Sequence, residues 1–366
     1  MKTREIGPPI TLTQRLVGRS PLDRRTARKS IYTMSIEQSR EVRLRSRPDA
    51  VPVPENFSFE TISLPEPGPG EVQVQNLFMS VDPYMRGRMR DRPSYVPPFQ
   101  VGKALEGGAV GRVVRSNHER LKVGDTVVSM LGWREAFNAP GDGLQTVDAD
   151  RLAPEAYLGT AGMPGMTAYV GLLHVIKIKA GETLFVSAAA GAVGSVVCQV
   201  AKIKGATVIG SAGGAEKCAF LREIGVDHAV DYKEVDDLTA TLSEAAPEGI
   251  DAYFDNVGGT HLEAALSVAK PFARFALCGM IAGYNGQETG PANLIFAVGK
   301  RLLLQGFLVS DHTDLRPAFL HEMTTWIQTG KVTSRQTVDE GIEQAPAAFL
   351  KLFTGENIGK MLVKLR

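Results

Sequence analysis

The residues best suited to a specific chemistry form a run of small side chains, Ser187-Ala-Ala-Ala-Gly-Ala-Val-Gly194. This run is the dinucleotide-binding pattern G-x-G-x-x-G with an alanine in place of the first glycine. Gly191 would let the backbone approach a pyrophosphate, and Gly194 would let a helix pack closely on a strand. The phosphate would lie at the helix N-terminus, where free N–H groups and the helix dipole favour an anion. The alternative for these glycines is a tight turn that binds no ligand.

The residues after the next expected strand, 206–210, favour NADP over NAD. Proteins that bind NAD carry an acidic residue near this point, about 20 positions beyond the glycines, for the ribose 2′-hydroxyl. Here the strand is followed by Ser211-Ala-Gly-Gly214, whose small side chains leave room, and then by Lys217, a cation suited to a 2′-phosphate. Glu216 argues against a phosphate, although its side chain would face away from that of Lys217. The alternative for Lys217 is an ordinary solvated helix lysine.

The cysteines and histidines do not have the spacing of a metal site. A catalytic zinc needs three or four Cys, His or carboxylate ligands in a compact shell. The cysteines at 198, 218 and 278 contain no C-x-x-C pair, and the six histidines show no H-x-x-x-H spacing. We therefore expect no metal ion. The sequence also lacks a P-loop and the G-x-S-x-G motif of hydrolases.

Length and composition set broad limits on the class of protein. The 366 residues are enough for two domains, and a net charge of +1 gives no argument for nucleic acid as a partner. An odd number of cysteines, three, suits a reducing compartment. No apolar run approaches the roughly 20 residues that a membrane span needs. We expect a soluble, cytoplasmic protein with neither a nucleic-acid nor a membrane partner.

The N-terminus differs from the rest of the chain. Residues 1–33 contain eight Lys or Arg and two Asp or Glu, a net charge of +6, whereas the whole chain carries +1. A composition that is rich in arginine and poor in acidic residues is found in disordered tails and in organelle transit peptides. A start codon placed upstream of Met34 is a third explanation. We expect residues 1–34 to be a basic, disordered tail outside the fold.

The elements that would hold these residues belong to two different kinds of sheet. From Glu41 to about Asp150, short β-like runs alternate with Gly- and Pro-rich turns, which is typical of a β-rich, barrel-like domain. From about Leu158 strands alternate with helical patterns, which indicates βαβ units and a parallel sheet. The expected strands are 71–77, 108–115, 125–130, 183–188, 206–210, 229–231, 251–255, 273–278, 303–309 and 360–364. The expected helices run from the glycine loop to Lys204 and over 215–224, 316–327 and 346–353.

Several longer motifs occur in a characteristic order between about Ser39 and Lys364. They include Ser80-Val-Asp-Pro-Tyr-Met-Arg-Gly-Arg-Met89, Gly162-Met-Pro-Gly-Met-Thr-Ala-Tyr169, Phe254-Asp-Asn-Val-Gly-Gly259 and Asn357-Ile-Gly-Lys360. Together they resemble the medium-chain dehydrogenase/reductase superfamily, in its zinc-free branch of prostaglandin reductases, plant double-bond reductases and bacterial curcumin reductase. The resemblance implies a GroES-like catalytic domain at 35–160, a Rossmann NADP-binding domain at 161–310 and a C-terminal return to the catalytic domain at 311–366.

The resemblance also implies NADPH as the cofactor and a set of residues around it. One of these residues, Asn357, is expected to hold the nicotinamide, but it could equally turn the chain before the last strand. The implied cofactor residues are Met163 and Thr167 on the nicotinamide side; Gly191, Ala192 and Val193 at the pyrophosphate, with Gly194 behind them; Lys217 and Tyr232 at the 2′-phosphate, beside Gly213; Asn256, Cys278 and Gly279 along the cofactor; and Phe307, Val309 and Asn357 around the nicotinamide.

The activity that the resemblance implies is reduction of the carbon–carbon double bond of α,β-unsaturated ketones and aldehydes. Tyr284 matches the tyrosine that the family places near the substrate carbonyl, although its lead-in, Ile281-Ala-Gly, is less polar than usual. A phenol can donate a hydrogen bond to the enolate oxygen that forms during such a reduction. Tyr84 and Arg86 lie in an N-terminal loop that would face the cleft. The alternatives are a core position for Tyr284 and a structural loop position for Tyr84.

Two other functions remain open for the same fold. One is an NADPH quinone oxidoreductase, which would reduce a ring rather than an enone. The other is a non-catalytic NADPH-binding protein, which would bind the cofactor without turnover. The resemblance also implies a homodimer in which two Rossmann sheets join edge to edge.

Overall fold

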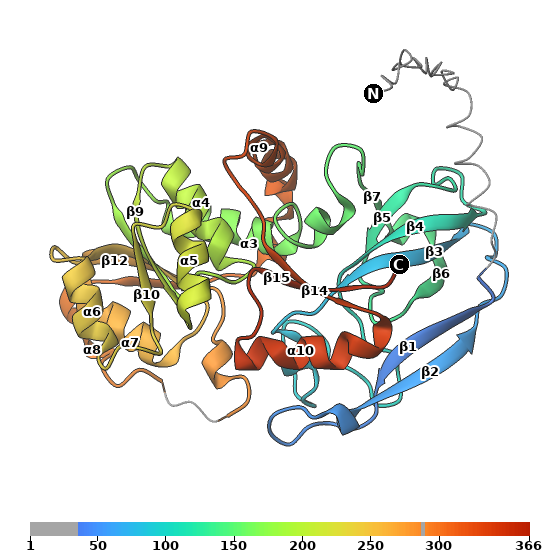
Figure 1. Ribbon diagram of the computed structural model, residues 1–366, viewed down its shortest axis with the longest axis horizontal. Coiled ribbons are helices and arrows are strands. Elements are labelled where there is room, and N and C mark those ends of the chain that lie inside the picture. Colours follow the sequence, from blue (N-terminus) through green and yellow to red (C-terminus); the bar gives the residue numbers. More distant parts are fainter. Residues whose placement is uncertain (1–35, 287–289) are drawn as a thin grey trace, which may run out of the picture.

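The computed structural model describes residues 36–286 and 290–366, so the expectations for the basic tail lie outside the described residues. The described chain forms two large sheets of different kinds in neighbouring parts of the molecule (Figure 1). One is a six-stranded parallel sheet, and the other has seven strands that are mostly antiparallel. A separate antiparallel pair joins β1 (Gln38–Leu44) to β2 (Phe57–Ser63). The predicted α/β fold, with a Rossmann sheet and a second, β-rich part, is confirmed.

The seven-stranded sheet contains strands from both ends of the described chain. Its order is β14-β15-β3-β4-β5-β7, with β6 paired to β3. Its strands are β3 (Glu71–Ser80), β4 (Ala109–Ser116), β5 (Thr126–Ser129), β6 (Ala136–Pro140), β7 (Gln145–Thr146), β14 (Gln336–Glu340) and β15 (Lys360–Lys364). Strand β15 pairs antiparallel with β3, where Leu362 lies opposite Ser80. The chain therefore returns to its first sheet after it has built the second.

The parallel sheet has the strand order of a dinucleotide-binding fold, β10-β9-β8-β11-β12-β13. Its strands are β8 (Thr183–Val186), β9 (Thr207–Ala212), β10 (His228–Asp231), β11 (Ile250–Asp255), β12 (Ala269–Leu277) and β13 (Leu303–Gly306). The first strand, β8, lies at the centre, so the connections leave it in opposite directions. A crevice for ligands forms at such a point, outside the carboxyl ends of the strands.

Helices cover both faces of the parallel sheet (Figure 1). They are α4 (Gly194–Ile203), α5 (Ala215–Glu223), α6 (Leu238–Ala245), α7 (Gly259–Val268) and α8 (Ile295–Lys300), with α3 (Met163–Val170) and α9 (Arg316–Gln328) nearby. In α4 the valines at 196, 197 and 200 are fully buried and share one face of the helix. Residues 184–186 of β8 are apolar and fully buried, as expected for a strand that is covered on both faces.

The remaining helices are short, apart from α10 (Ala345–Thr354). They are α2 (Met85–Arg88), a π-helix η4 (Gly171–Ile176) and the 3₁₀ segments η1 (Pro54–Asn56), η2 (Gly141–Gly143), η3 (Pro154–Leu158), η5 (Ile281–Gly283), η6 (Val309–Leu315) and η7 (Ile342–Gln344). No helix among the described residues is both long and apolar enough to span a membrane.

One predicted strand, 303–309, is wrong at its C-terminal end. Strand β13 stops at Gly306, and Val309 begins the 3₁₀ segment η6. The reason is packing: the ring of Phe307 turns edge-on to Phe254, with ring centroids 6.2 Å apart. After Gly306 the pairing with β12 ends, and Phe307 packs against the core that contains α3 and α4.

A buried ion pair fastens β15 to the loop that follows β3. The Lys360 ammonium donates hydrogen bonds to the Asp82 carboxylate at 3.0 Å and to the backbone oxygens of Val81 and Met361 at 2.9 and 3.0 Å. The hydroxyl of Ser80 also donates to the Asp82 carboxylate. Both side chains of the ion pair are more than nine-tenths buried, so the bonds that they make to one another replace those to water.

We expect Lys360→Met to destabilise the fold, because it keeps an apolar side chain but leaves the Asp82 carboxylate buried without its cation. The expected loss in the free energy of unfolding is about 3 kcal/mol, measured by urea denaturation. The matched control is Lys364→Met in the same strand, whose partner Glu340 is exposed. That change should cost less than about 1 kcal/mol. Equal losses in the two variants would contradict a structural role for the buried pair.

Candidate active site

The glycine loop joins β8 to α4 with almost no free space. A Cβ added at Gly194 would lie 2.4 Å from the Ala188 backbone oxygen, so only glycine allows α4 to begin this close to the strand. A Cβ at Gly191 would lie 3.1 Å from the same oxygen. Ala189, which replaces the first glycine of the pattern, is fully buried and donates its backbone N–H to Ser211 at 2.9 Å. The loop is thus fixed against β9.

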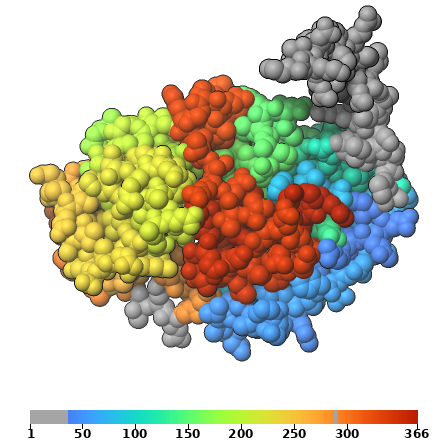
Figure 2. Space-filling view, in the orientation of Figure 1, coloured from blue at the N-terminus to red at the C-terminus, as the bar shows by residue number. Residues whose placement is uncertain are grey.

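A segment near the end of the chain lies directly on this loop. Gly359 donates its backbone N–H to the Ala190 oxygen at 2.7 Å, and Gly359 forms an isolated parallel bridge with Gly191. The Asn357 side-chain amide donates to the Gly359 oxygen at 3.0 Å. Figure 2 shows the C-terminal residues wedged between the half that carries the parallel sheet and the N-terminal half. The turn that contains Asn357 is therefore brought next to the glycines at 191–194.

The end of β9 carries the candidate 2′-phosphate site. A Cβ at Gly213 would lie 2.9 Å from the Tyr232 hydroxyl and 2.8 Å from Lys233 Cε, so both side chains extend over this glycine. The Lys217 ammonium donates to the Gly355 oxygen at 2.7 Å rather than facing open solvent. Burial lowers the pKa of Lys217, and the charge of Lys233 lowers it further. The two cations are thus close enough to repel one another, as groups in a site for a divalent anion do.

Glu216 does not block this site. Its carboxylate is exposed and pairs with Arg335 at 3.0 Å. Lys233 is a residue that the sequence analysis missed. The signal for it was its position directly after Tyr232, one residue beyond the end of β10.

Polar residues at the ends of β11 and β12 continue the same edge of the sheet. The Asn256 side-chain amide donates to the Ser187 oxygen at 2.8 Å, which ties it to the glycine loop. The backbone N–H groups of Cys278 and Gly279 donate to the Asp255 oxygen at 2.9 and 3.0 Å. Burial, followed by the charge of Asp255, raises the pKa of the Cys278 thiol to about 12. The thiol therefore stays protonated, which makes it a poor nucleophile toward an electrophilic substrate.

The residues expected around the nicotinamide come from three elements. Met163 begins α3 and is 42% exposed, and the Thr167 hydroxyl donates to the Met163 oxygen at 2.8 Å. Phe307 and Val309 are half-buried and pack against the core that contains α3 and α4. A Cβ at Gly171 would lie 2.7 Å from the Phe307 ring, so the glycine at the start of η4 makes room for it.

Tyr284 follows η5 and lies beside the turn at Cys278 and Gly279. Its hydroxyl is 3.5 Å from the position that a Cβ would take at Gly279. Burial, and then the neighbouring Tyr95, raise the pKa of Tyr284, while a hydrogen bond from the Met280 backbone lowers it. The net pKa is raised, so the phenol is protonated at neutral pH and can donate a hydrogen bond.

Tyr84 lies in the β-rich part, at the start of α2. It is half-buried against a core cluster that also contacts Phe353. Burial and the charge of Asp82 raise the pKa of Tyr84. Tyr95 interacts electrostatically with both Tyr84 and Tyr284, so it lies near both. The sequence analysis assigned no role to Tyr95.

Arg86 lies deeper than the sequence analysis expected. It is fully buried rather than open to a cleft, and its Nε donates to the Asn285 side-chain oxygen at 2.9 Å. The guanidinium of Arg90 donates to the Tyr284 backbone oxygen at 2.8 Å. These two arginines, which the sequence analysis did not connect to Tyr284, join the loop after β3 to the loop after β12.

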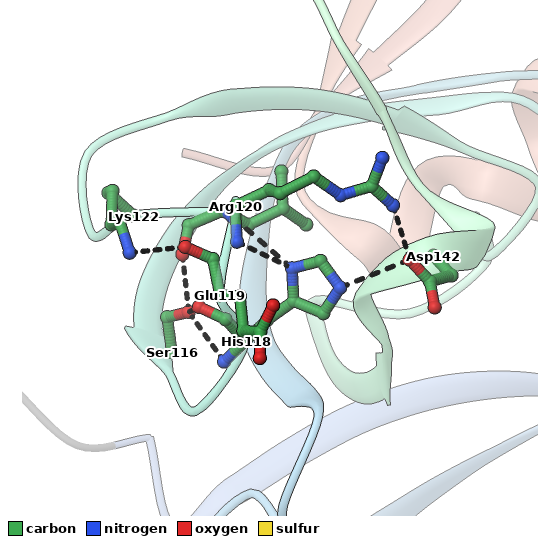
Figure 3. Close-up of polar contacts among 7 residues, drawn as sticks. Ser116, His118, Glu119, Arg120, Lys122 and Asp142 are labelled. Atoms are coloured by element: carbon green, nitrogen blue, oxygen red, sulfur yellow. Dashed lines mark hydrogen bonds and ion pairs between the residues drawn. The ribbon is translucent and has the colours of Figure 1, made fainter.

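A histidine–carboxylate contact elsewhere resembles part of a catalytic dyad (Figure 3). His118 Nε2 lies 3.2 Å from an Asp142 carboxylate oxygen, and the Arg120 guanidinium pairs with the same oxygen. His118 Nδ1, however, accepts the backbone N–H groups of Arg120 and Leu121 at 3.3 and 3.2 Å. Both ring nitrogens are therefore used to hold the turn between β4 and β5, and we assign this cluster a structural role.

The part of the chain that the structure describes contains no group of three or more His, Cys, Asp or Glu side chains that could hold a metal ion. A Rossmann sheet with a glycine loop lies beside a mostly antiparallel sheet, and the loop after β3 in that second sheet carries Tyr84 and Tyr95. This is the architecture of a dinucleotide-dependent oxidoreductase.

Comparisons with known proteins agree with this class. Residues 40–147 match the family model described as the N-terminal domain of oxidoreductase, and residues 192–325 match the model described as zinc-binding dehydrogenase. The chain is 41% identical to the NADPH-dependent curcumin reductase of Escherichia coli, over 90% of this chain and 97% of that protein. It is 45% identical to the NADP(+)-dependent 2-alkenal reductase of Nicotiana tabacum, over 83% and 90%.

Among solved structures, CurA from Vibrio vulnificus in complex with NADPH aligns with a TM-score of 0.85 and 39% identity, over 89% of this chain and 99% of that chain. The protein belongs to the zinc-free branch of the medium-chain dehydrogenase/reductase family. The resemblance inferred from the motifs is thereby confirmed. The individual roles of the site residues stay predictions.

Proposed function

We propose that this protein uses NADPH to reduce the carbon–carbon double bond of α,β-unsaturated ketones and aldehydes. The single observation that carries the proposal within the structure is Tyr284, a protonated phenol beside the carboxyl ends of the strands that carry the glycine loop. The relatives named curcumin reductase and 2-alkenal reductase, both above 40% identity, support the same substrate class.

The described residues fit NADPH at three points. Gly191 and Gly194 leave the glycine loop close to the start of α4, where a pyrophosphate would meet free N–H groups. Tyr232 and Lys233 lie over Gly213, and Lys217 lies close enough to Lys233 for their charges to interact. A 2′-phosphate there would offset the repulsion between the two ammonium groups. Asn256 and Asn357 would lie along the cofactor between this end and the tyrosines, with Phe307 and Val309 behind the nicotinamide.

NADPH, when bound, supplies a hydride to the β-carbon of the enone. Negative charge then develops on the substrate oxygen, and the Tyr284 hydroxyl donates a hydrogen bond to it. A phenol is protonated in the neutral range, and burial raises the pKa of Tyr284 further, so it remains a donor. A proton reaches the α-carbon from water or from the Tyr284 hydroxyl, which completes the saturated product. Tyr84 would close the opposite side of the pocket.

We propose that the chain acts as a cytoplasmic homodimer. Strand β13 is an edge of the parallel sheet, and large apolar side chains are exposed on and near it. They are Phe272, Leu294, Ile295, Phe296, Val298 and Leu303. Exposed apolar patches and unpaired strand edges favour association with another chain. The free state of all three cysteines is consistent with a reducing compartment.

We also propose the division into domains at about residues 160 and 310. All six strands of the parallel sheet fall within residues 183–306. The seven strands of the other sheet fall at 71–146 and 336–364.

The proposed activity predicts that NADPH absorbance falls only when an enone is present and that the product is the saturated ketone. The assay would compare curcumin and simple enals with quinones and saturated aldehydes. Tyr284→Phe should lower kcat about 100-fold, as loss of one oxyanion donor does, whereas Tyr157→Phe, which removes a hydroxyl bonded to Asp148, should change little. Faster turnover of quinones would favour the quinone oxidoreductase, and binding without turnover would favour the non-catalytic protein.

The cofactor assignment predicts that Lys217→Ala and Lys233→Ala each weaken NADPH binding about 10-fold or more, because each removes a charged contact worth roughly 1.5–3 kcal/mol. NADH binding should change little, since NADH has no 2′-phosphate. Fluorescence titration measures both dissociation constants. The control is Lys331→Ala, because Lys331 is an exposed lysine that is not one of the candidate cofactor residues. Wild-type protein that binds the two cofactors equally well would contradict the assignment.

The proposed dimer predicts that Val298→Asp yields a monomer, because it places a charge on a side chain that is 72% exposed within the apolar patch. Light scattering after size-exclusion chromatography measures the mass. Val123→Asp, at a turn of the other sheet where the side chain is 48% exposed, should leave the dimer intact. A monomeric wild-type protein would refute the proposal.

A further inference from the structure

The loop that carries Tyr284 follows the parallel sheet, and it is held by two arginines that follow β3 in the other sheet. Arg90 donates from Nη2 to the Tyr284 backbone oxygen at 2.8 Å, and Arg86 donates from Nε to the Asn285 side-chain oxygen at 2.9 Å. Both arginines belong to α2 and the residues just after it, which follow β3. The contacts join residues 194 and 199 positions apart in the chain. They therefore connect the two parts of the molecule at the tyrosine itself.

Arg86 is costly to keep where it is. It is fully buried, it forms none of the ion pairs found among the described residues, and its Nη1 has no hydrogen-bond partner. Its charged neighbours are Arg90 and Arg92, and burial together with these charges lowers the pKa of Arg86 to about 10. A buried cation among other cations is unfavourable unless its hydrogen bonds are needed. The bonds that Arg86 does make go to Ala50 and Asn285.

The other restraints on this loop act before Tyr284. Ile281 and Ala282 donate backbone N–H groups to Asn256 and Val257 at 3.3 and 3.2 Å, which fixes the start of η5. On the far side of the tyrosine, the two arginines supply the contacts that the structure describes. The direction of the Tyr284 backbone therefore depends on Arg90, and that of the next residue on Arg86.

We propose that Arg86 and Arg90 are positioning residues that hold the Tyr284 phenol in place for enone reduction. This inference rests on the proposed function. The arginines act through the loop and not through a charge effect on the phenol. The groups that influence the pKa of Tyr284 are its burial, Tyr95, the Met280 backbone and Cys278, with no arginine among them.

The first test is a double-mutant cycle in the full-length protein. Arg90→Ala should lower kcat for an enone by about 100-fold, the effect expected when a reacting group shifts by about 1 Å, with the dissociation constant for NADPH changed less than twofold. In a Tyr284→Phe background, Arg90→Ala should cost little more, because its effect passes through the same phenol. Arg90→Lys keeps a donor and should recover part of the activity.

Asn285→Ala tests the second contact from the other side, by removing the acceptor and keeping Arg86 itself. It should lower kcat in the same direction as Arg90→Ala. The control is Arg92→Ala, which removes an equal charge near Arg86 from an exposed side chain of the same loop. Additive losses in the Tyr284→Phe background, or an equal loss in Arg92→Ala, would overturn the proposal.

Hydrogen exchange of residues 281–286, followed by mass spectrometry on the NADPH-bound protein, provides a readout that needs no turnover. Arg90→Ala should speed exchange in this segment by about 10-fold or more, as expected when a local opening costs about 1.4 kcal/mol less, while Arg92→Ala should not. If the wild-type protein reduces no enone but the exchange result holds, the proposed function fails and the arginine contacts stand. Unchanged exchange in Arg90→Ala would refute the positioning role.

Discussion

The arrangement of the site depends on four consecutive residues near the end of the chain, 357–360. Within them, Gly359 is bonded to the glycine loop of the parallel sheet, and Lys360 is bonded to Asp82 in the loop after β3. The first bond fixes the floor of the cofactor cleft. The second fixes the loop that leads to Tyr84, two residues after Asp82, and then to Arg86 and Arg90. A single short turn therefore sets the position of both sides of the site at once.

Some basic side chains of the candidate site take part in none of the ion pairs that the structure describes. At one end Lys217 and Lys233 repel one another beyond the end of β9, and at the other Arg86 lies buried near Arg90. The two pairs have different uses. The lysines lie at the exposed end of β9, where an anion can enter and offset the repulsion. Arg86 is fully buried and Arg90 is half-buried. Among the described residues, their hydrogen bonds go to the loop of Tyr284 and to the Ala50 carbonyl, which are uncharged acceptors.

Local sequence patterns predicted the parts of this arrangement that arise from neighbouring residues. The glycine loop, the valine face of α4 and strand β15 at 360–364 each follow from spacing within about ten residues. The contacts of Arg90 with Tyr284 and of Lys360 with Asp82 could not be predicted in this way. They join residues 194 and 278 positions apart, and nothing local distinguishes these basic residues from solvated ones.

The end of strand β13 shows a second limit of prediction from local sequence. The run 303–309 has the composition of a strand throughout, but tertiary packing of Phe307 against Phe254 ends it at Gly306. Similarly, Lys233 follows Tyr232 in the sequence as any surface lysine might follow a tyrosine. Only the glycine at 213, which lies beneath both side chains, gives it a role.

The position of β15 between β14 and β3 has a consequence for biosynthesis. While the ribosome is still making residues 336–364, the parallel sheet can already form, but residues 78–80 of β3 lack the partner that β15 will provide. An unpaired strand edge in a nascent chain is a site of misassociation. The cofactor loop lacks its Gly359 contact over the same interval. The glycine loop of the parallel sheet therefore gains its C-terminal contact only after translation has passed residue 359.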